Sequence, residues 1–166
     1  MKNKKVYIAL SVDFVHHGHI NLIQKAKKLG SVTLGLLTDK AISYKKELPY
    51  LSYNQRLQIV QSFNGIDNVV PQNEWDYSNN ILKIKPDFFV HGDDWNFNGE
   101  TDLKKSALKA LKKVSGKLIE IEHVKDISSS SLKKKSTNVG GTPDVRRSSL
   151  KRLFNSGKFL KFIEVH

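Results

Sequence analysis

Two histidines, His16 and His19, flank Gly18 shortly after a short apolar run. If this segment opens a helix, its first turn offers an anion unsatisfied backbone N–H groups and the positive end of the helix dipole. Gly18 lets the backbone approach a phosphate closely, and imidazole N–H groups can stabilise charge that develops on phosphates during group transfer. From the residue types alone, two other interpretations remain: the histidines could be a metal-binding pair or ordinary surface residues. A zinc site would need a third protein ligand, for which Asp13 is the candidate.

The elements that must position these residues follow the pattern of a parallel α/β sheet. Strands alternate with helices, and the strands are apolar runs of the kind that is covered on both faces. Ligands bind outside the carboxyl ends of such strands, which is where the segment from His16 to His19 falls. The predicted strands are residues 6–12, 31–38, 68–70, 87–91 and 117–123, and the predicted helices are residues 18–29, 52–63, 78–84, 100–114 and 128–135.

Two segments predict irregular structure. Residues 39–51 contain Pro49 and show no apolar periodicity, so they predict a loop. Directly after them, Ser52 and Gln55 have the spacing of a capping box and predict the start of a helix. Residues 136–144 include a Gly-Gly-Thr-Pro run and predict a linker.

Composition limits the classes of partner. The chain has 166 residues, no cysteine and a net charge of +12, and more than half of the excess charge lies in residues 124–166. No aromatic residue is interleaved with Lys133-Lys134-Lys135, so we expect a solvated helix end and not a nucleic-acid partner. We also expect no membrane partner, because no apolar run is long enough to span a bilayer and no secretory signal is present. The lack of cysteine excludes disulfides and fits a cytoplasmic location.

The order Asp-x-x-His-x-Gly-His after a first strand resembles the signature of the cytidylyltransferase family of nucleotidyltransferases. The likeness covers roughly residues 5–135, and it implies a Rossmann-like α/β fold with a parallel sheet of about five strands flanked by helices. It also marks residues 1–135 as a cytidylyltransferase domain. The further matches, in family order, are Lys45 and Lys46 in a loop, Ser52-Tyr53-Asn54-Gln55-Arg56, His91-Gly92-Asp93-Asp94-Trp95, and Ile127-Ser128-Ser129-Ser130.

The resemblance assigns roles to these residues. It implies catalysis by His16, His19, Lys46 and Arg56, with Mg²⁺ held through the substrate phosphates and Asp13 the one protein ligand considered for it. It implies contacts with CTP from Ser11, Val12, Asp13, Gly18, Lys45, His91, Gly92, Asp93, Asp94, Ile127, Ser128, Ser129 and Ser130.

Each match also has a plainer interpretation. Loop lysines are usually solvated, an arginine such as Arg56 on a helix is usually exposed, and Trp95 can belong to the core. Paired acids such as Asp93 and Asp94 are common in capping turns, and serines at a helix start are ordinary N-caps.

Two departures from the glycerol-phosphate branch bear on the acceptor. Leu10-Ser11-Val12-Asp13 stands where that branch has Gly-Thr-Phe-Asp, and the arginine that precedes its helix-opening Ile-Ser-Thr-Thr is lost here, with Lys125 the nearest substitute. Both changes resemble the phosphonate-activating branch. Residues 145–166 are similar to the opening helix and strand of phosphoenolpyruvate mutase, so we expect the chain to be the N-terminal part of a fusion with that enzyme.

The leading hypothesis is transfer of CMP from CTP to a phosphonate such as 2-aminoethylphosphonate, with release of pyrophosphate. Alternatives are a phosphate alcohol as acceptor (glycerol 3-phosphate, phosphoethanolamine or phosphocholine), an adenylyltransferase of the same fold, and a non-catalytic basic nucleotide-binding module. We expect a homodimer, as is common in the family. The residues considered for binding the acceptor are Trp75, Asp76, Tyr77 and Lys125, although a loop tryptophan is more often a packing anchor.

Overall fold

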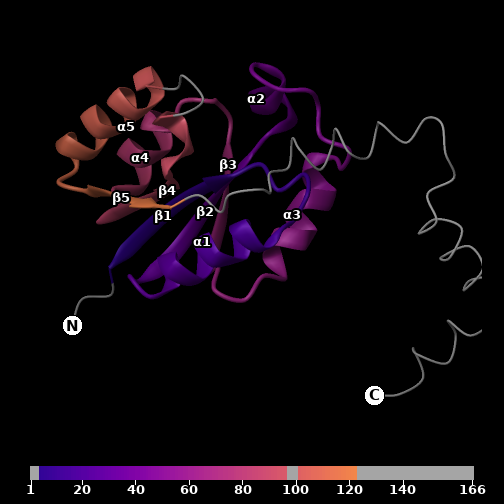
Figure 1. The fold of residues 1–166 in the computed structure, drawn as a ribbon, viewed down its shortest axis with the longest axis horizontal. Helices are drawn as coiled ribbons and strands as arrows, with labels where there is room; N and C mark the ends of the chain where they lie inside the picture. Colours follow the sequence, from indigo (N-terminus) through magenta and orange to yellow (C-terminus); the bar gives the residue numbers. More distant parts are fainter. Residues whose placement is uncertain (1–3, 97–100, 123–166) are drawn as a thin grey trace, which may run out of the picture. The chain divides into compact units, whose positions relative to one another are not determined.

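Five parallel strands form the sheet of this protein. The computed structural model describes residues 4–96 and 101–122 (Figure 1). The strands are β1 (Lys5–Leu10), β2 (Ser31–Leu37), β3 (Asn68–Gln72), β4 (Phe88–Gly92) and β5 (Lys117–Ile121). Their order in the sheet is β3-β2-β1-β4-β5, so the strand order reverses between β1 and β4. The prediction of a parallel α/β sheet of about five strands is confirmed.

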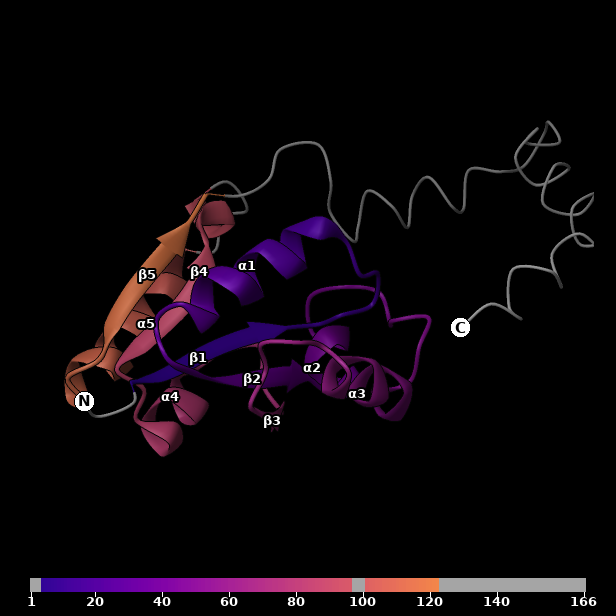
Figure 2. The same cartoon turned by 90° about the horizontal axis from the view of Figure 1, so that it is seen from below.

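Helices cover both faces of the sheet (Figures 1 and 2). One face carries α1 (His17–Lys27) and α3 (Tyr53–Gln61), and the other carries α4 (Ser78–Ile84) and α5 (Thr101–Lys113). Alternate residues of each strand point to opposite faces, so β1 divides its side chains between two cores. Val6 and Ile8 pack with Ile23 of α1, whereas Tyr7 and Ala9 pack with Ile81 of α4.

One short helix was not predicted. Residues 39–51 were expected to form a loop, but Asp39–Ser43 forms the helix α2. Thr38 starts it, because its hydroxyl accepts the backbone N–H of Ala41, and Ala41 and Ile42 are buried. A helix of one turn is too short for a periodic pattern to reveal. The capping box of α3 is confirmed, since the Gln55 side chain accepts the N–H of Ser52.

Carboxylates fix the amino ends of the strands, opposite the edge where the predicted site lies. Asp67 accepts the ammonium of Lys27 at 2.7 Å and the backbone N–H of Val32 at 2.7 Å. Asp87 accepts the ammonium of Lys4 at 2.8 Å and the N–H of Lys5 at 2.9 Å. The two aspartates therefore set where β1 and β2 begin.

Within residues 4–96 and 101–122, none of the helices combines the length and the apolar character that crossing a membrane would require.

The anchor at Asp67 predicts a measurable acid sensitivity. The Lys27 ammonium and then the Val32 N–H hold the pKa of Asp67 below its ordinary value of 3.8. The stability that this carboxylate contributes is thus complete above that value and is lost as the pH falls through the lowered pKa. Asp67→Asn should cost about 1 kcal/mol at neutral pH. Urea denaturation over a pH series should show this difference shrinking in acid, and a constant difference would contradict the assignment.

Candidate active site

The predicted site residues that the structure describes follow the carboxyl ends of β1, β2, β3 and β4. His16 lies directly before α1 in an extended conformation, with φ −142° and ψ 166°, and α1 begins at His17. The structure thus places His16 and His19 on the first turn of a helix, where the sequence predicted them. His16 and His19 are half-buried, whereas His17 between them is exposed.

The two half-buried histidines form a stacked pair. Their ring centroids lie 3.9 Å apart with an interplanar angle of 27°. The backbone N–H of His16 donates to Nδ1 of His19 over 3.4 Å. Because Nδ1 of His19 accepts this bond, Nε2 is the ring nitrogen that can carry a proton and donate it to an anion.

Gly18 makes room for this pair. A Cβ atom at position 18 would lie 2.9 Å from Nδ1 and 3.0 Å from Cε1 of the His16 ring. Any other residue would therefore push the His16 ring away from the helix. The glycine thus serves the geometry of the histidines, and the close approach of its backbone to a phosphate stays a prediction.

The turn before the histidines is strained and held on both sides. Val12 is buried and has a φ of 54°, an unfavourable region for a β-branched residue. The carbonyl of Ser11 accepts a hydrogen bond from the Arg56 guanidinium. The carboxylate of Asp13 accepts the backbone N–H of Tyr50 at 2.8 Å. These bonds hold the residues on either side of Val12 and keep the turn in place.

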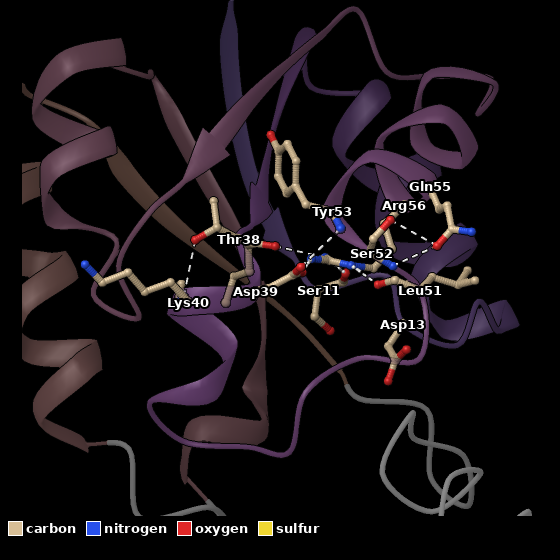
Figure 3. A network of polar contacts seen from close by, with 12 residues as sticks. Ser11, Asp13, Thr38, Asp39, Lys40, Leu51, Ser52, Tyr53, Gln55 and Arg56 are labelled. Carbon is tan, nitrogen blue, oxygen red and sulfur yellow. Dashed lines mark hydrogen bonds and ion pairs between the residues drawn. The ribbon is translucent and has the colours of Figure 1, made fainter.

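The side chain of Arg56 is fully buried, and Figure 3 shows it in a network of polar contacts with Ser11, Asp39 and Leu51. Besides Ser11, it donates to the carbonyls of Leu37 at 2.8 Å and Leu51 at 3.1 Å, and to the carboxylate of Asp39 at 2.6 Å. The plain interpretation of Arg56 as an exposed helix residue is therefore wrong. The catalytic role that the resemblance implies for Arg56 stays a prediction.

The lysine loop follows α2. Lys45 and Lys46 are exposed, and their backbone N–H groups both donate to the carbonyl of Ile42, at 3.1 and 2.9 Å. The ammonium of Lys46 lies 5.4 Å from the centre of the Trp75 ring. The structure therefore brings together Lys46, predicted to be catalytic, and Trp75, predicted to bind the acceptor.

The loop that carries Trp75 is organised by Gln72, a buried residue that the sequence analysis missed. Its amide nitrogen donates to the carbonyls of Glu74 at 2.7 Å and Asp76 at 2.8 Å. Its amide oxygen accepts from the hydroxyl of Tyr7 and from Asn80. Burial raises the pKa of Tyr7, so the hydroxyl stays protonated and remains a donor. A glutamine that ends an apolar strand was the available signal.

The neighbours of Trp75 have other partners. Asp76 accepts the backbone N–H of Ser78 at 2.7 Å at the start of α4. Burial raises the pKa of Asp76, but hydrogen bonds from Ser106 and Ser78 outweigh it and leave the pKa below its ordinary value. Tyr77 is buried, and its hydroxyl lies 3.2 Å from Nε2 of His91. The ring of Trp75 lies beside the Lys46 ammonium of the lysine loop.

The segment after β4 is a packed turn. His91 is buried with its ring stacked on Trp95 at 4.0 Å, and its Nδ1 lies 2.7 Å from the carbonyl oxygen of Gly92. Trp95 is fully buried, and its indole N–H donates to Glu120. Trp95 is therefore a core residue, as its plainer interpretation held.

The paired acids lie in the short 3₁₀ turn η1 (Asp93–Asn96) and are half-buried. A Cβ at Gly92 would lie 2.8 Å from Oδ1 of Asp94, so this glycine leaves room for that carboxylate. The predicted residues Lys125, Ile127, Ser128, Ser129 and Ser130 lie outside the described residues, as do the predicted linker, residues 136–144, and tail, residues 145–166.

In residues 4–96 and 101–122, no group of three or more histidines and carboxylates could hold a metal ion by itself. Asp13, the one ligand considered for Mg²⁺, uses a carboxylate oxygen to hold Tyr50. Binding of Mg²⁺ through the substrate phosphates, which the resemblance implies, stays a prediction.

Comparison with known families matches residues 11–135 to the cytidylyltransferase-like family. The chain is 33% identical over 110 residues to the glycerol-3-phosphate cytidylyltransferase of Bacillus subtilis, covering 65% of this chain and 84% of the relative. It is 31% identical over 110 residues to the FAD synthase of Ferroglobus placidus, covering 64% of this chain and 72% of the relative.

Among solved structures, the lipopolysaccharide core biosynthesis protein from Thermoplasma volcanium superposes with a TM-score of 0.60 at 22% identity. The match covers 75% of this chain and 99% of that protein. A pantothenate synthetase from Thermus thermophilus gives 0.51 at 11% identity, covering 81% of this chain and 65% of that one. These likenesses establish the fold.

The close contact between Gly18 and the His16 ring predicts that Gly18→Ala opens the histidine stack without unfolding the protein. The new methyl group displaces the ring, whereas alanine favours the helix by roughly 0.5–1 kcal/mol over glycine. NMR of the imidazole groups should show altered resonances for His16 and His19, with Gln24→Ala on the exposed face of α1 as the control. Unchanged histidine resonances would refute the proposed role of the glycine.

Proposed function

The chain belongs to the cytidylyltransferase-like family, and on that premise we propose that it transfers CMP from CTP to a small phosphonate such as 2-aminoethylphosphonate, releasing pyrophosphate. An oxygen of the acceptor attacks the α-phosphorus in line and forms the new P–O bond. The bond from the α-phosphorus to the bridging oxygen of the β-phosphate breaks, and pyrophosphate leaves with its electron pair. No covalent intermediate with the enzyme forms.

The observation that carries this proposal is the stacked pair of His16 and His19 on the first turn of α1. Two imidazoles and the helix N-terminus offer N–H donors to one anion. Charge on the phosphate oxygens grows during the transfer, so donors fixed in advance stabilise the transition state more than the bound substrate. The pair therefore suits catalysis better than simple retention of a nucleotide.

Other residues bind the remaining parts of the substrates. Lys45 and Lys46 carry positive charge on an exposed loop close to the ends of β2 and β3 and contact phosphate oxygens. Asp93 and Asp94 hydrogen-bond the base or ribose. Residues 127–130 contribute the β- and γ-phosphate contacts that the family resemblance implies. Mg²⁺, when bound, neutralises charge on the phosphates.

The choice of acceptor depends on the relatives, on two departures in the sequence and on one contact in the structure. The relatives named glycerol-3-phosphate cytidylyltransferase favour a phosphate alcohol, whereas the departures at residues 10–13 and 123–126 favour a phosphonate. Lys46 beside Trp75 supports an acceptor with charges of both signs. Its phosphonate can pair with the Lys46 ammonium, and its own ammonium can lie on the indole face, which attracts cations.

Two further proposals concern the whole protein. Residues 145–166 resemble the start of phosphoenolpyruvate mutase, which supports a fusion in which one domain makes a phosphonate and the other activates its product. We also propose a homodimer, because dimers are common in the family.

The proposed reaction predicts release of pyrophosphate when the protein is incubated with CTP, Mg²⁺ and 2-aminoethylphosphonate. His16→Ala should lower kcat about 100-fold, because a donor that acts in the transition state is lost. His17→Ala removes an exposed neighbouring imidazole and is the matched control. ATP in place of CTP tests the adenylyltransferase alternative, and absence of pyrophosphate with every phosphonate and phosphate alcohol would rule out the proposal.

The proposed acceptor contact predicts a selective effect of Trp75→Leu. Loss of the indole face should raise KM for 2-aminoethylphosphonate about 2- to 30-fold, equivalent to about 0.5–2 kcal/mol of cation–π attraction. KM for 2-hydroxyethylphosphonate, which has the same size without the ammonium, should change little. Trp75→Phe keeps an aromatic face and should restore most of the difference. Equal effects on both acceptors would contradict the contact.

A further inference from the structure

Four backbone and side-chain acceptors from three separate segments meet at one guanidinium group. Arg56 donates to Ser11 at the end of β1, to Leu37 and Asp39 around the end of β2, and to Leu51. Figure 3 shows Ser11, Asp39 and Leu51 around Arg56. A side chain on α3 thereby ties together segments that are up to 45 residues away from it in the sequence.

We infer that Arg56 and Asp39 are positioning residues, which hold the turn that carries His16 and His19 at a fixed distance from the loop that carries Lys45 and Lys46. This inference rests on the proposed function, in which the two segments act on the same phosphates. Neither residue needs to touch the substrate in this role.

The tie to the histidines runs through the strained turn. Arg56 holds the carbonyl of Ser11, the residue directly before Val12 with its φ of 54°. The unfavourable conformation of Val12 persists because its neighbours are held. Release of the Ser11 carbonyl would let the turn relax and would move the segment that leads to His16.

Arg56 also binds residues on both sides of the loop that carries the two lysines. Asp39 stands at the start of α2, before Lys45 and Lys46, and Leu51 stands after them. The same guanidinium binds the Asp39 carboxylate at 2.6 Å and the Leu51 carbonyl at 3.1 Å. Asp39 also accepts the N–H of Tyr53 through its second oxygen, at 3.4 Å. Both ends of the segment between Asp39 and Leu51 are thereby bonded to Arg56.

A third contact joins the two segments directly. The Asp13 carboxylate, in the turn before His16, accepts the N–H of Tyr50, next to Leu51. This bond and the Arg56 bonds therefore hold the same pair of segments from two sides. The turn and the loop can be expected to move as one unit while both sets of bonds are intact.

The chemistry of the junction calls for arginine. Its acceptors lie around a flat group, and arginine offers five N–H donors in a fixed plane. Lysine would keep the charge but has three donors on a single nitrogen, which cannot reach acceptors on opposite sides. The Arg56 side chain is fully buried, whereas the Asp39 side chain is 43% exposed. Asparagine has nearly the same shape as aspartate, so Asp39→Asn removes the negative charge beside Arg56 and disturbs the Tyr53 contact with little change in packing.

The test compares Arg56→Lys and Asp39→Asn with Asp67→Asn, which removes a carboxylate of similar bonding at the opposite ends of the strands. In Arg56→Lys and Asp39→Asn the two segments are no longer held together, and kcat should fall about 100-fold, the scale expected for misplaced catalytic groups. KM for CTP should change much less, because a group that is badly placed in the transition state affects kcat and kcat/KM together. Asp67→Asn should lose stability and keep its kcat.

Amide hydrogen exchange followed by mass spectrometry supplies a readout that needs no turnover. Both positioning variants should exchange faster in residues 11–19 and in residues 44–51, and Asp67→Asn should show this in neither. This result would stand even if the chain proved to use another substrate. The inference is overturned if only one of the two segments loosens, or if Asp39→Asn and Asp67→Asn have the same effect on exchange and kcat.

Discussion

A buried guanidinium needs an acceptor for its N–H groups, and this requirement organises the edge of the sheet where the candidate site lies. Arg56 has no exposed side-chain surface and carries a positive charge, so every acceptor that it uses must come from the protein. A buried charge without partners would be far more costly than the ordering of a few loop residues. The ends of β1 and β2 and the segment around Leu51 therefore converge on it, and the site is built on the surface that results.

Much of the fold could be predicted because its signals are local and repeated. The strand around Val6–Ile8 is apolar throughout, as a strand covered on both faces must be, and α3 announces itself by its capping box. The helix α2 escaped prediction because its five residues are set by one hydroxyl at Thr38 and by tertiary burial of Ile42. A single turn leaves no period in the sequence.

The location of the candidate site was predictable from the sequence, whereas the contacts of its side chains were not. Parallel strands end at one edge, so motifs after β1 and β4 had to meet there. The burial of Arg56 could not be read from the sequence, because a helical arginine carries no sign of whether carbonyls from distant segments surround it. The same holds for Gln72, whose partners in the 74–76 turn and on Tyr7 are brought near only by the completed sheet. Contacts between segments far apart in the chain could not be predicted from the sequence.

The conformation of Val12 affects the free energy that is available when a substrate binds. A φ of 54° in a β-branched residue costs on the order of 1–3 kcal/mol, and that cost is borne once, when the protein folds. A glycine at this position would adopt the same turn without strain but would also populate many others. Valine disfavours this turn by itself, so the bonds from Arg56 to Ser11 and from Tyr50 to Asp13 are what hold the segment before His16 in order before any ligand arrives. Less conformational entropy then remains to be lost on binding, and more of the interaction energy is available to favour the transition state.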